Sequence, residues 1–227
     1  MNRSSTFYEK LTIGMLLAAA AGGLDAYSYL EHGEVFAGLQ TGNLILLGIH
    51  LGQFKWEQTV QYVVSILFFA IGTIIVRWFQ KHERLLKRNA FSIDECVLMY
   101  EISLIVLVAL FSKILPNTLV TGMLSLTASA QLQHFRKLNG GPFTSLMMTG
   151  NIRTAAESMY DALIEKNQTA WRKGLDTLSI IGSFVGGALI SGALTGILGS
   201  FTIIFSGMAL FAIILIRYTD IKNKSLR

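Results

Sequence analysis

The tripeptide Thr41-Gly42-Asn43 recurs, residue for residue, as Thr149-Gly150-Asn151, and both copies lie inside apolar segments. Glycine weakens a helix interior, and an asparagine amide needs hydrogen-bond partners that aliphatic surroundings do not offer. The copies lie 108 residues apart, and at this offset residues 14–43 align without a gap on residues 122–151, with 10 identities in 30 positions. Chance would give about two or three at ordinary residue usage. The sequence therefore predicts an internal repeat organised around the two tripeptides.

The composition is that of an integral membrane protein. Of the 227 residues, 52% are hydrophobic and 15% are charged, whereas soluble domains contain about 25% charged residues. The apolar residues form long blocks, which predicts an all-α protein embedded in the lipid bilayer. The cations lie between these blocks, so the net charge of +5 indicates orientation in the membrane and no nucleic-acid partner. The single cysteine excludes an internal disulfide, and no cofactor is indicated.

Six apolar blocks are predicted to be full transmembrane helices. They cover residues 11–30, 59–79, 95–115, 118–135, 175–195 and 200–217. The first block is interpreted as a mature span rather than a signal peptide, because its pattern recurs in mid-chain. Two further apolar segments, 35–51 and 143–163, contain the tripeptides and can either cross the membrane or enter it and return. Residues 1–10 and 218–227 are predicted to be cytoplasmic tails.

The basic connections decide between these two topologies. If both tripeptide segments crossed, the most basic connection, residues 80–94, would lie on the side opposite the N-terminus. If each is re-entrant, both termini and the connections 80–94, 136–141 and 165–173 lie in the cytoplasm, as the positive-inside rule requires. Each repeat, 11–115 and 118–217, then contributes three full spans, so the copies have opposite orientations in the cell membrane. Inverted repeats whose broken helices meet near the midplane are common in transporters.

The predicted binding site lies where the two tripeptide segments meet. Side-chain oxygens and freed backbone groups at a helix break can coordinate a solute or ion. The alternative is that these residues only pack and hydrogen-bond against neighbouring helices. Asp25 is a further candidate because a carboxyl within a span is a functional hypothesis by default, unless the span ends early and Asp25 lies among the headgroups. The predicted binding residues are Asp25, Gln40, Thr41, Gly42, Asn43, Gln133 (the repeat mate of Asp25), Thr149, Gly150 and Asn151.

Other polar and glycine residues have simpler explanations. Arg153 and Glu157 stand at i, i+4 spacing and can pair on one helix face. Glu101 lies near the start of its span and can snorkel or pair with a loop cation. The histidines show no ligand spacing with acids or the cysteine, so no metal site is predicted. Gly182-Ser-Phe-Val-Gly186 is a GxxxG sequence, which predicts close helix packing, either within the chain or in a homodimer.

The sequence around both tripeptides resembles a known bacterial family. Gly22-Gly23-Leu24-Asp25-Ala26-Tyr27-Ser28-Tyr29, then Gly33, Val35-Phe36-Ala37 and Gln40-Thr41-Gly42-Asn43-Leu44, resemble the opening signature of the YoaK-like family. Met148-Thr149-Gly150-Asn151, followed closely by an arginine and small residues, resembles its second signature. The likeness covers nearly the whole chain. It implies a bacterial multispanning membrane protein of unknown function, and it implies no substrate and no catalytic residue.

These observations favour a transporter or channel for a small molecule or ion. An intramembrane enzyme is less favoured, because no Ser–His, Cys–His or HExxH arrangement occurs. A structural or partner-stabilising membrane protein is the main alternative, ahead of the enzyme. A sealed, apolar interior around both asparagines would favour that class, whereas a continuous polar cavity would favour transport. We expect Asn43 and Asn151 to approach each other near the middle of the membrane.

Overall fold

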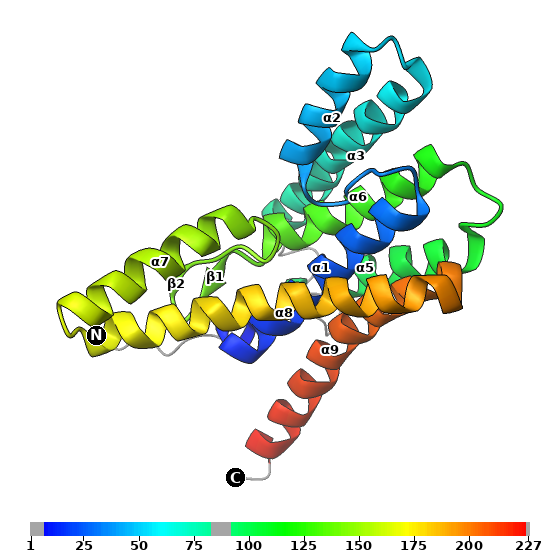
Figure 1. Ribbon diagram of the computed structural model, residues 1–227. Helices are drawn as coiled ribbons and strands as arrows, with labels where there is room; N and C mark the ends of the chain where they lie inside the picture. The colour runs from blue at the N-terminus through cyan, green and yellow to red at the C-terminus, as the bar shows by residue number, and fades with distance from the viewer. Residues whose placement is uncertain (1–6, 83–91, 226–227) are drawn as a thin grey trace.

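The computed structural model describes residues 7–82 and 92–225, almost all of which lie in helices (Figure 1). The first half contains η1 (Phe7–Glu9), α1 (Leu11–Glu31), α2 (Gln40–Gly52), α3 (Trp56–Lys81) and α5 (Ile93–Phe111). The second half contains α6 (Asn117–His134), β1 (Lys137–Leu138), β2 (Gly141–Pro142), α7 (Met148–Ile164), α8 (Gln168–Leu198), η2 (Gly199–Ile203) and α9 (Ile204–Ser225). The two short strands pair antiparallel, Leu138 opposite Gly141. The predicted all-α class is confirmed.

Each apolar segment predicted from the sequence contains a helix, and in both tripeptide segments the helix begins well after the predicted start. Helix α2 begins at Gln40 and α7 at Met148, so irregular backbone precedes each tripeptide within its predicted segment. Helix α8 extends through most of the connection between the last two predicted spans, and the 3₁₀ helix η2 takes up the first residues of the last predicted span. The basic connection predicted at 80–94 lies largely outside the described residues.

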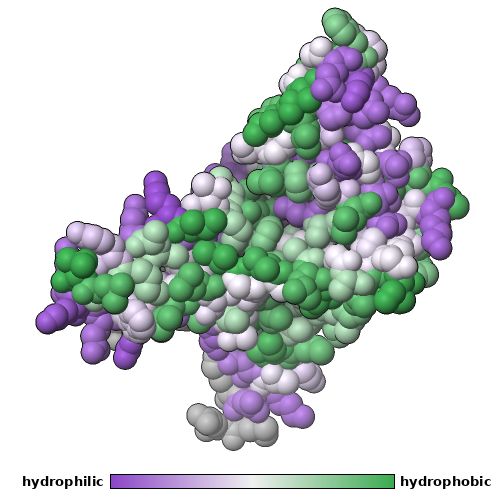
Figure 2. Space-filling view, viewed as in Figure 1, coloured by the Kyte–Doolittle hydropathy of each residue, from purple (hydrophilic) through white to green (hydrophobic). Residues whose placement is uncertain are grey.

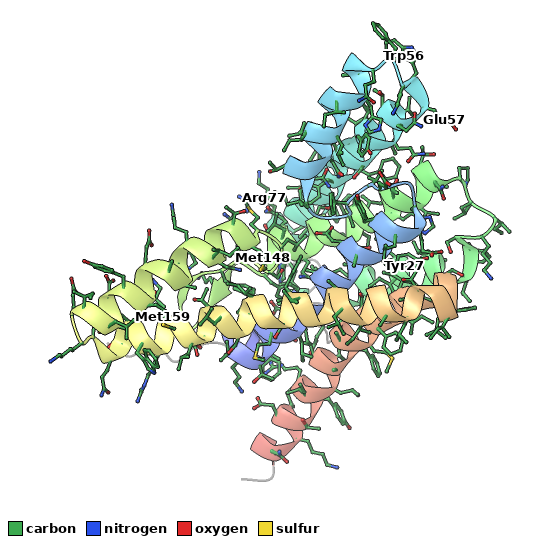
Figure 3. All side chains as sticks on the ribbon, in the orientation of Figure 1. Tyr27, Trp56, Glu57, Arg77, Met148 and Met159 are labelled. Carbon is green, nitrogen blue, oxygen red and sulfur yellow. The ribbon has the colours of Figure 1, made fainter. Side chains whose placement is uncertain are left out.

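Three helical stretches of the described chain are long and apolar enough to cross a membrane: Leu11–Glu31, Trp56–Lys81 and Gln168–Asn223. The last combines α8, η2 and α9. In α3, Glu57 lies near one end and Arg77 near the other (Figure 3), about 30 Å apart at 1.5 Å per residue, which matches the hydrocarbon thickness of a bilayer. Hydrophobic side chains cover the visible flank of α8, while hydrophilic ones gather at the tip of the α7–α8 hairpin (Figure 2). The count of six full spans stays a prediction.

Local sequence signals explain where several helices start and turn. Helix α5 begins with a capping box, in which the Ser92 Oγ accepts the Glu95 N–H at 3.3 Å and the Glu95 carboxylate accepts the Ser92 N–H at 2.8 Å. Asn167 caps α8 by accepting two N–H groups of its first turn, at 3.0 and 3.1 Å. The α2–α3 and α7–α8 hairpins turn through left-handed residues, Phe54 (φ 58°) and Lys166 (φ 54°).

The helices pack in pairs that combine the two halves of the chain. Helix α1 packs along α8, and α6, which holds the corresponding place in the second half, packs along α3. Likewise α5 contacts α6, and α9 contacts α1. Helix α2 lies on α3 and α7 lies on α8, and these two hairpins project from the centre in different directions (Figure 1). The buried core therefore lies between the halves and depends on both.

Glycines allow the α1 and α8 backbones to touch. A Cβ on Gly22 would overlap the carbonyl oxygen of Phe184, and a Cβ on Gly187 would overlap the carbonyl oxygen of Ala19. Small residues permit such close contact between helices in membranes. Gly72 has the same role on α3, where a Cβ would lie 3.0 Å from a backbone oxygen of α6.

The GxxxG pair of α8 lies on a different face from this contact. A Cβ on Gly182 or Gly186 would meet no described atom within 4 Å, whereas the adjacent Gly187 makes the contact with α1. The close packing within the chain therefore uses Gly187. The alternative predicted use of the GxxxG pair, a homodimer seam, stays a prediction.

Candidate functional site at two helix breaks

The first helix break, residues 32–39 between α1 and α2, is held by side chains. Asn43, in the first turn of α2, grips the backbone of Phe36: its Oδ1 accepts the Phe36 N–H at 2.9 Å, and its Nδ2 donates to the Phe36 carbonyl at 2.7 Å. The Nδ2 also lies 3.1 Å from the Gln40 Oε1 and 3.0 Å from the Ser65 Oγ of α3. Asn43 is fully buried. The amide therefore supplies the pairing that this backbone lacks outside a helix.

Asp25 supports the same loop from α1. Its Oδ1 accepts the Gly38 N–H at 2.6 Å, and nearby on α1 the Ser28 hydroxyl donates to the Val35 carbonyl at 2.7 Å. Asp25 is only 6% exposed, so it lies inside the protein. Its depth in the membrane stays a prediction. No described lysine, arginine or histidine forms an ion pair with it. The break therefore holds a buried carboxyl that is hydrogen-bonded to backbone and has no cationic partner in the described chain.

The remaining residues of the first tripeptide segment divide between interior and surface. Gln40 is half-buried and also donates to the Ala37 carbonyl at 2.9 Å. Gly42 packs against the Phe36 ring, where a Cβ would lie 3.1 Å from a ring carbon. Thr41 is exposed. The structure therefore brings Asp25, Gln40 and Asn43 to one break and leaves the threonine on its outside.

The second break, between α6 and α7, repeats part of this arrangement. The Asn151 Nδ2 donates to the Thr144 carbonyl at 3.0 Å, and these two residues lie 108 positions after Asn43 and Phe36. The backbone turn into the helix also recurs: the Gln40 N–H donates to the Gly38 carbonyl at 2.9 Å, and the Met148 N–H donates to the Leu146 carbonyl at 3.1 Å. The second clamp is looser, because Asn151 is only half-buried. Thr149 and Gly150 are both exposed.

Gln131, rather than the aligned Gln133, supports the second break. Gln131 is fully buried, and its Nε2 donates to the Ser145 Oγ at 2.5 Å and to the Leu17 carbonyl at 2.9 Å. Gln133 instead donates to the Gln80 Oε1 of α3 at 3.2 Å. The reason is helix length: α1 continues to Glu31 past its supporting residue, whereas α6 ends at His134, only three residues after Gln131. A gapless alignment ignores this difference.

The tips of the two breaks touch inside the protein. A Cβ on Gly38 would overlap a methyl group of Leu146 and would lie 3.3 Å from its Cγ and 3.4 Å from the Cβ of Ala128. The first break is also tied to α6, because the Ser65 and Ser125 hydroxyls hydrogen-bond at 2.8 Å and Ser65 contacts the Asn43 amide. No described hydrogen bond joins the two tripeptide asparagines directly. Their approach to each other stays a prediction.

A polar hollow of about 320 Å³ lies at the end of α6 near Gln133, and sequence reasoning did not select it. His134 and Asp94 meet there at 2.9 Å, beside the Gln80–Gln133 pair and Arg77. Its residues come from helix ends that lie far apart in the chain. From the sequence, only the polar residues near the ends of the predicted spans could have indicated this hollow. Gln133 lines this hollow and therefore lies apart from the other residues of the predicted site.

Two other acids lie in contrasting places. Arg153 and Glu157 approach to 3.7 Å with side chains 77% and 65% exposed, so they form a surface pair. Glu101 is fully buried, and neither carboxylate oxygen has a hydrogen-bond partner among the described residues. The sequence suggested that Glu101 can snorkel to the surface, and its burial shows that it does not. No group of three or more described His, Cys, Asp or Glu side chains is placed to hold a metal ion.

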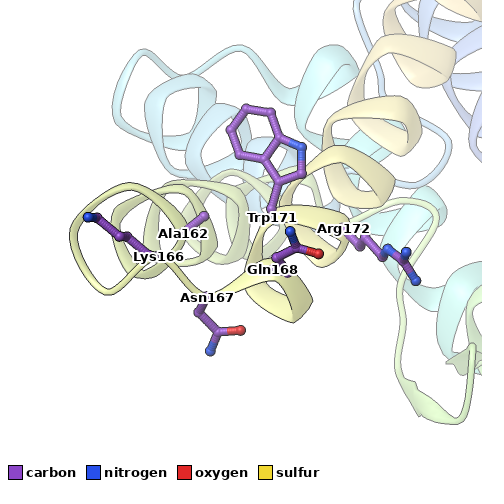
Figure 4. Close-up of a pocket in the computed structure, with 6 residues that line it drawn as sticks. All are labelled: Ala162, Lys166, Asn167, Gln168, Trp171 and Arg172. Carbon is purple, nitrogen blue, oxygen red and sulfur yellow. The ribbon is translucent and has the colours of Figure 1, made fainter.

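A hollow of about 290 Å³ at the tip of the α7–α8 hairpin is lined by cationic and aromatic residues. Lys166 and Arg172 point to opposite sides of Trp171 (Figure 4). Because the two cations do not converge, the hollow does not form a cradle for an anion. Tryptophan and basic side chains together are typical of the membrane–water interface.

The apolar helices and the two irregular breaks define a helical membrane protein with discontinuous helices. The protein family of unknown function DUF1275 matches residues 13–216, so this chain belongs to that family, and the resemblance noted in the sequence is confirmed. The chain is similar to the UPF0700 transmembrane protein YoaK of Bacillus subtilis (strain 168), at 24% identity over 158 residues, which are 69% of this chain and 70% of that protein. No solved structure matches.

Proposed function

We propose that the protein is a transporter or channel that moves a small molecule or ion across the cell membrane, through a site at the junction of the two breaks. The observation that supports this most strongly is the contact between Gly38 and Leu146, beside the buried Asp25 carboxyl. Irregular backbone within a membrane protein is tolerated where it is buried in protein or lines a cavity, and transporters place their sites at such breaks. The proposal assigns no catalytic activity to the chain.

The proposal includes an inverted repeat with three full spans and one re-entrant segment in each half. Three correspondences support it. The α1–α8 packing corresponds to the α6–α3 packing. The Asn43–Phe36 bond corresponds to the Asn151–Thr144 bond. The turns at Phe54 and Lys166 share a left-handed backbone. In this arrangement both termini are cytoplasmic, and the first break is entered from outside and the second from inside.

In the proposed mechanism, the structure represents a closed state of the first break. Asn43 and Asp25 hold the Phe36–Gly38 backbone in place, and the Asn43 amide is fully occupied by protein groups. Exchange of these bonds for bonds to a solute or water would open the break. The looser clamp at Asn151 suggests that the second break requires less free energy to open than the first.

A structural role is the second candidate, and one observation favours it. Because Asn43 is fully buried with its donors and acceptor all satisfied, the first tripeptide can serve solely to close a loop. The two functions differ in whether the junction must move. A cross-link across the junction leaves a structural role intact and stops a transport cycle.

The test is solute flux with the two break tips joined. Gly38→Cys and Leu146→Cys, in a Cys96→Ser background, place thiols close enough for a disulfide. The double variant is reconstituted in vesicles and challenged with gradients of inorganic ions, amino acids and organic cations. We expect at least one class to give a protein-dependent flux that oxidation abolishes and reductant restores, while oxidation leaves any flux through each single-cysteine variant unchanged. No flux across the panel, or flux that survives complete cross-linking, would favour the structural role.

A further inference from the structure

A groove of about 330 Å³ lies between α1, the first break and α8. Its walls are formed by Tyr29 and Leu30 of α1, Phe36 and Leu39 of the break and Phe184 of α8. Gly22, Ala26 and Ala188 are the small residues that leave this space open. This volume is within the range of small-molecule sites, which begins near about 300 Å³.

Asp25 is the only charged residue among the described residues that line the groove. Its carboxylate accepts the Gly38 N–H, and the backbone N–H groups of Ala37 and Leu39 also interact with it. A carboxylate has roughly four acceptor positions, so about one remains for a ligand. A carboxylate in apolar surroundings is costly to keep charged unless a positive group pairs with it. Because no described side chain supplies that charge, the groove is complementary to a cationic ligand.

The walls favour an organic cation over a metal ion. Metal cations such as Ca²⁺ and Mg²⁺ take about six or more oxygen ligands, and this lining offers one carboxylate among mostly apolar side chains. The Tyr29 and Phe36 rings are stacked with centroids 4.9 Å apart, and Phe184 contributes a third aromatic ring to the lining. Aromatic faces attract organic cations and pack well against apolar or aromatic bodies.

The surface around the groove is apolar. Leu30 is 53% exposed and Leu39 is 41% exposed, and on α8 the neighbouring Val185 and Leu189 are 57% and 65% exposed. In a membrane protein, exposed aliphatic side chains on a helix flank face lipid. A ligand would therefore reach Asp25 sideways from the bilayer, which requires that it be lipophilic.

We infer that this groove binds a lipophilic monovalent organic cation, with the positive group at Asp25 and the apolar body against the three aromatic rings. The inference rests on the proposed function and deepens it by naming the class of solute. The groove adjoins the first break, because Phe36 belongs to its lining and Asp25 bonds to Gly38. Release of the cation toward the break would couple binding to the opening of the Asn43 clamp.

The test measures binding without any gradient. Ethidium is titrated into the purified protein in phosphatidylcholine nanodiscs, and fluorescence anisotropy reports saturation. We expect saturable binding, weakened at least about tenfold by Asp25→Asn, since loss of a close opposite charge commonly costs about 1.4 kcal/mol or more. Glu157→Gln, an exposed acid outside the groove, should bind as the wild type does. Neutral phenanthridine should bind the wild type more weakly than ethidium does. It should bind the wild type and Asp25→Asn equally well.

A second variant keeps the inference testable if Asp25→Asn fails to fold. Ala188→Phe fills the groove from α8 without removing a hydrogen bond, and it should abolish ethidium binding in a protein that remains folded. Equal ethidium affinity in the wild type and in folded Asp25→Asn or Ala188→Phe would overturn the inference. So would tighter binding of phenanthridine than of ethidium, which would indicate a groove for neutral lipid. If this inference fails, the protein can still transport another solute. If ethidium binds but no solute is transported, the transport proposal is rejected and the assignment of the groove stands.

Discussion

Gly38 and Leu146 lie in contact at the centre of the protein although they are 108 residues apart, which is the same offset that aligns the two tripeptides. Two residues related by a two-fold repeat can touch only near the axis that relates the halves. The contact therefore locates where such an axis would pass, between the tips of the two breaks. It also means that the two halves restrain each other at their least regular backbone.

Gly38→Ala should destabilise the protein by about 1–3 kcal/mol, because the new methyl group overlaps the Leu146 side chain. Leu146→Ala should remove that overlap, so the double variant should be less destabilised than the sum of the two single variants. Gly48→Ala is the matched control, since a Cβ there meets no described atom within 4 Å. Thermal unfolding in detergent measures all four proteins. Additive effects would indicate that the two tips do not touch.

Asn43→Ala should cost more than Asn151→Ala. The first change leaves the Phe36 N–H without a partner and leaves the Phe36 carbonyl with only the Ser65 hydroxyl, which costs roughly 1–3 kcal/mol. The second removes one good hydrogen bond from a half-buried site, worth roughly 1 kcal/mol. Unfolding midpoints of the two variants in the same detergent provide the comparison. Equal losses would show that the two clamps are equivalent and that the burial difference has no energetic consequence.

Gly22→Ala and Gly187→Ala should each disrupt the α1–α8 packing, because the added methyl group meets a backbone carbonyl that cannot move aside. Gly182→Ala and Gly186→Ala should be neutral or stabilising by up to about 1 kcal/mol, since both sites are open and alanine is the better helix former. Expression level and thermal stability in detergent distinguish the pairs. A destabilising Gly182→Ala would instead indicate that a second copy packs on this face.

Stability should fall as the pH drops below about 6.5, partly because of His32. Burial lowers the pKa of His32, although its hydrogen bond to Asn117 and the nearby Glu31 oppose this effect. The unfolded chain then binds a proton that the folded chain resists, so acidification favours unfolding. His32 also bonds to Tyr27 at 3.2 Å. His32→Gln should flatten the dependence of the unfolding midpoint on pH between about 7.5 and 5. An unchanged slope would show that His32 is not responsible for the dependence of stability on pH.

Much of this architecture could be predicted from the sequence, because a glycine and an amide inside an apolar block have few explanations other than a helix break. The partners of those residues could not. Asn43 holds Phe36 through a loop with no periodic pattern, and the support of the second break shifts from Gln133 to Gln131 because α1 and α6 differ in length beyond it. The burial of Glu101 depends on which helices cover α5, and hydropathy along one chain does not contain that information.

The inverted repeat is the central claim, and side-specific labelling of two equivalent turns tests it most directly. Phe54 and Lys166 each lie two residues beyond the end of a short helix and share a left-handed backbone. In a Cys96→Ser background, we expect Phe54→Cys to react with a membrane-impermeant maleimide on intact cells, and Lys166→Cys to react only after the cells are permeabilised. Labelling of both cysteines from the same side of the membrane would contradict the account.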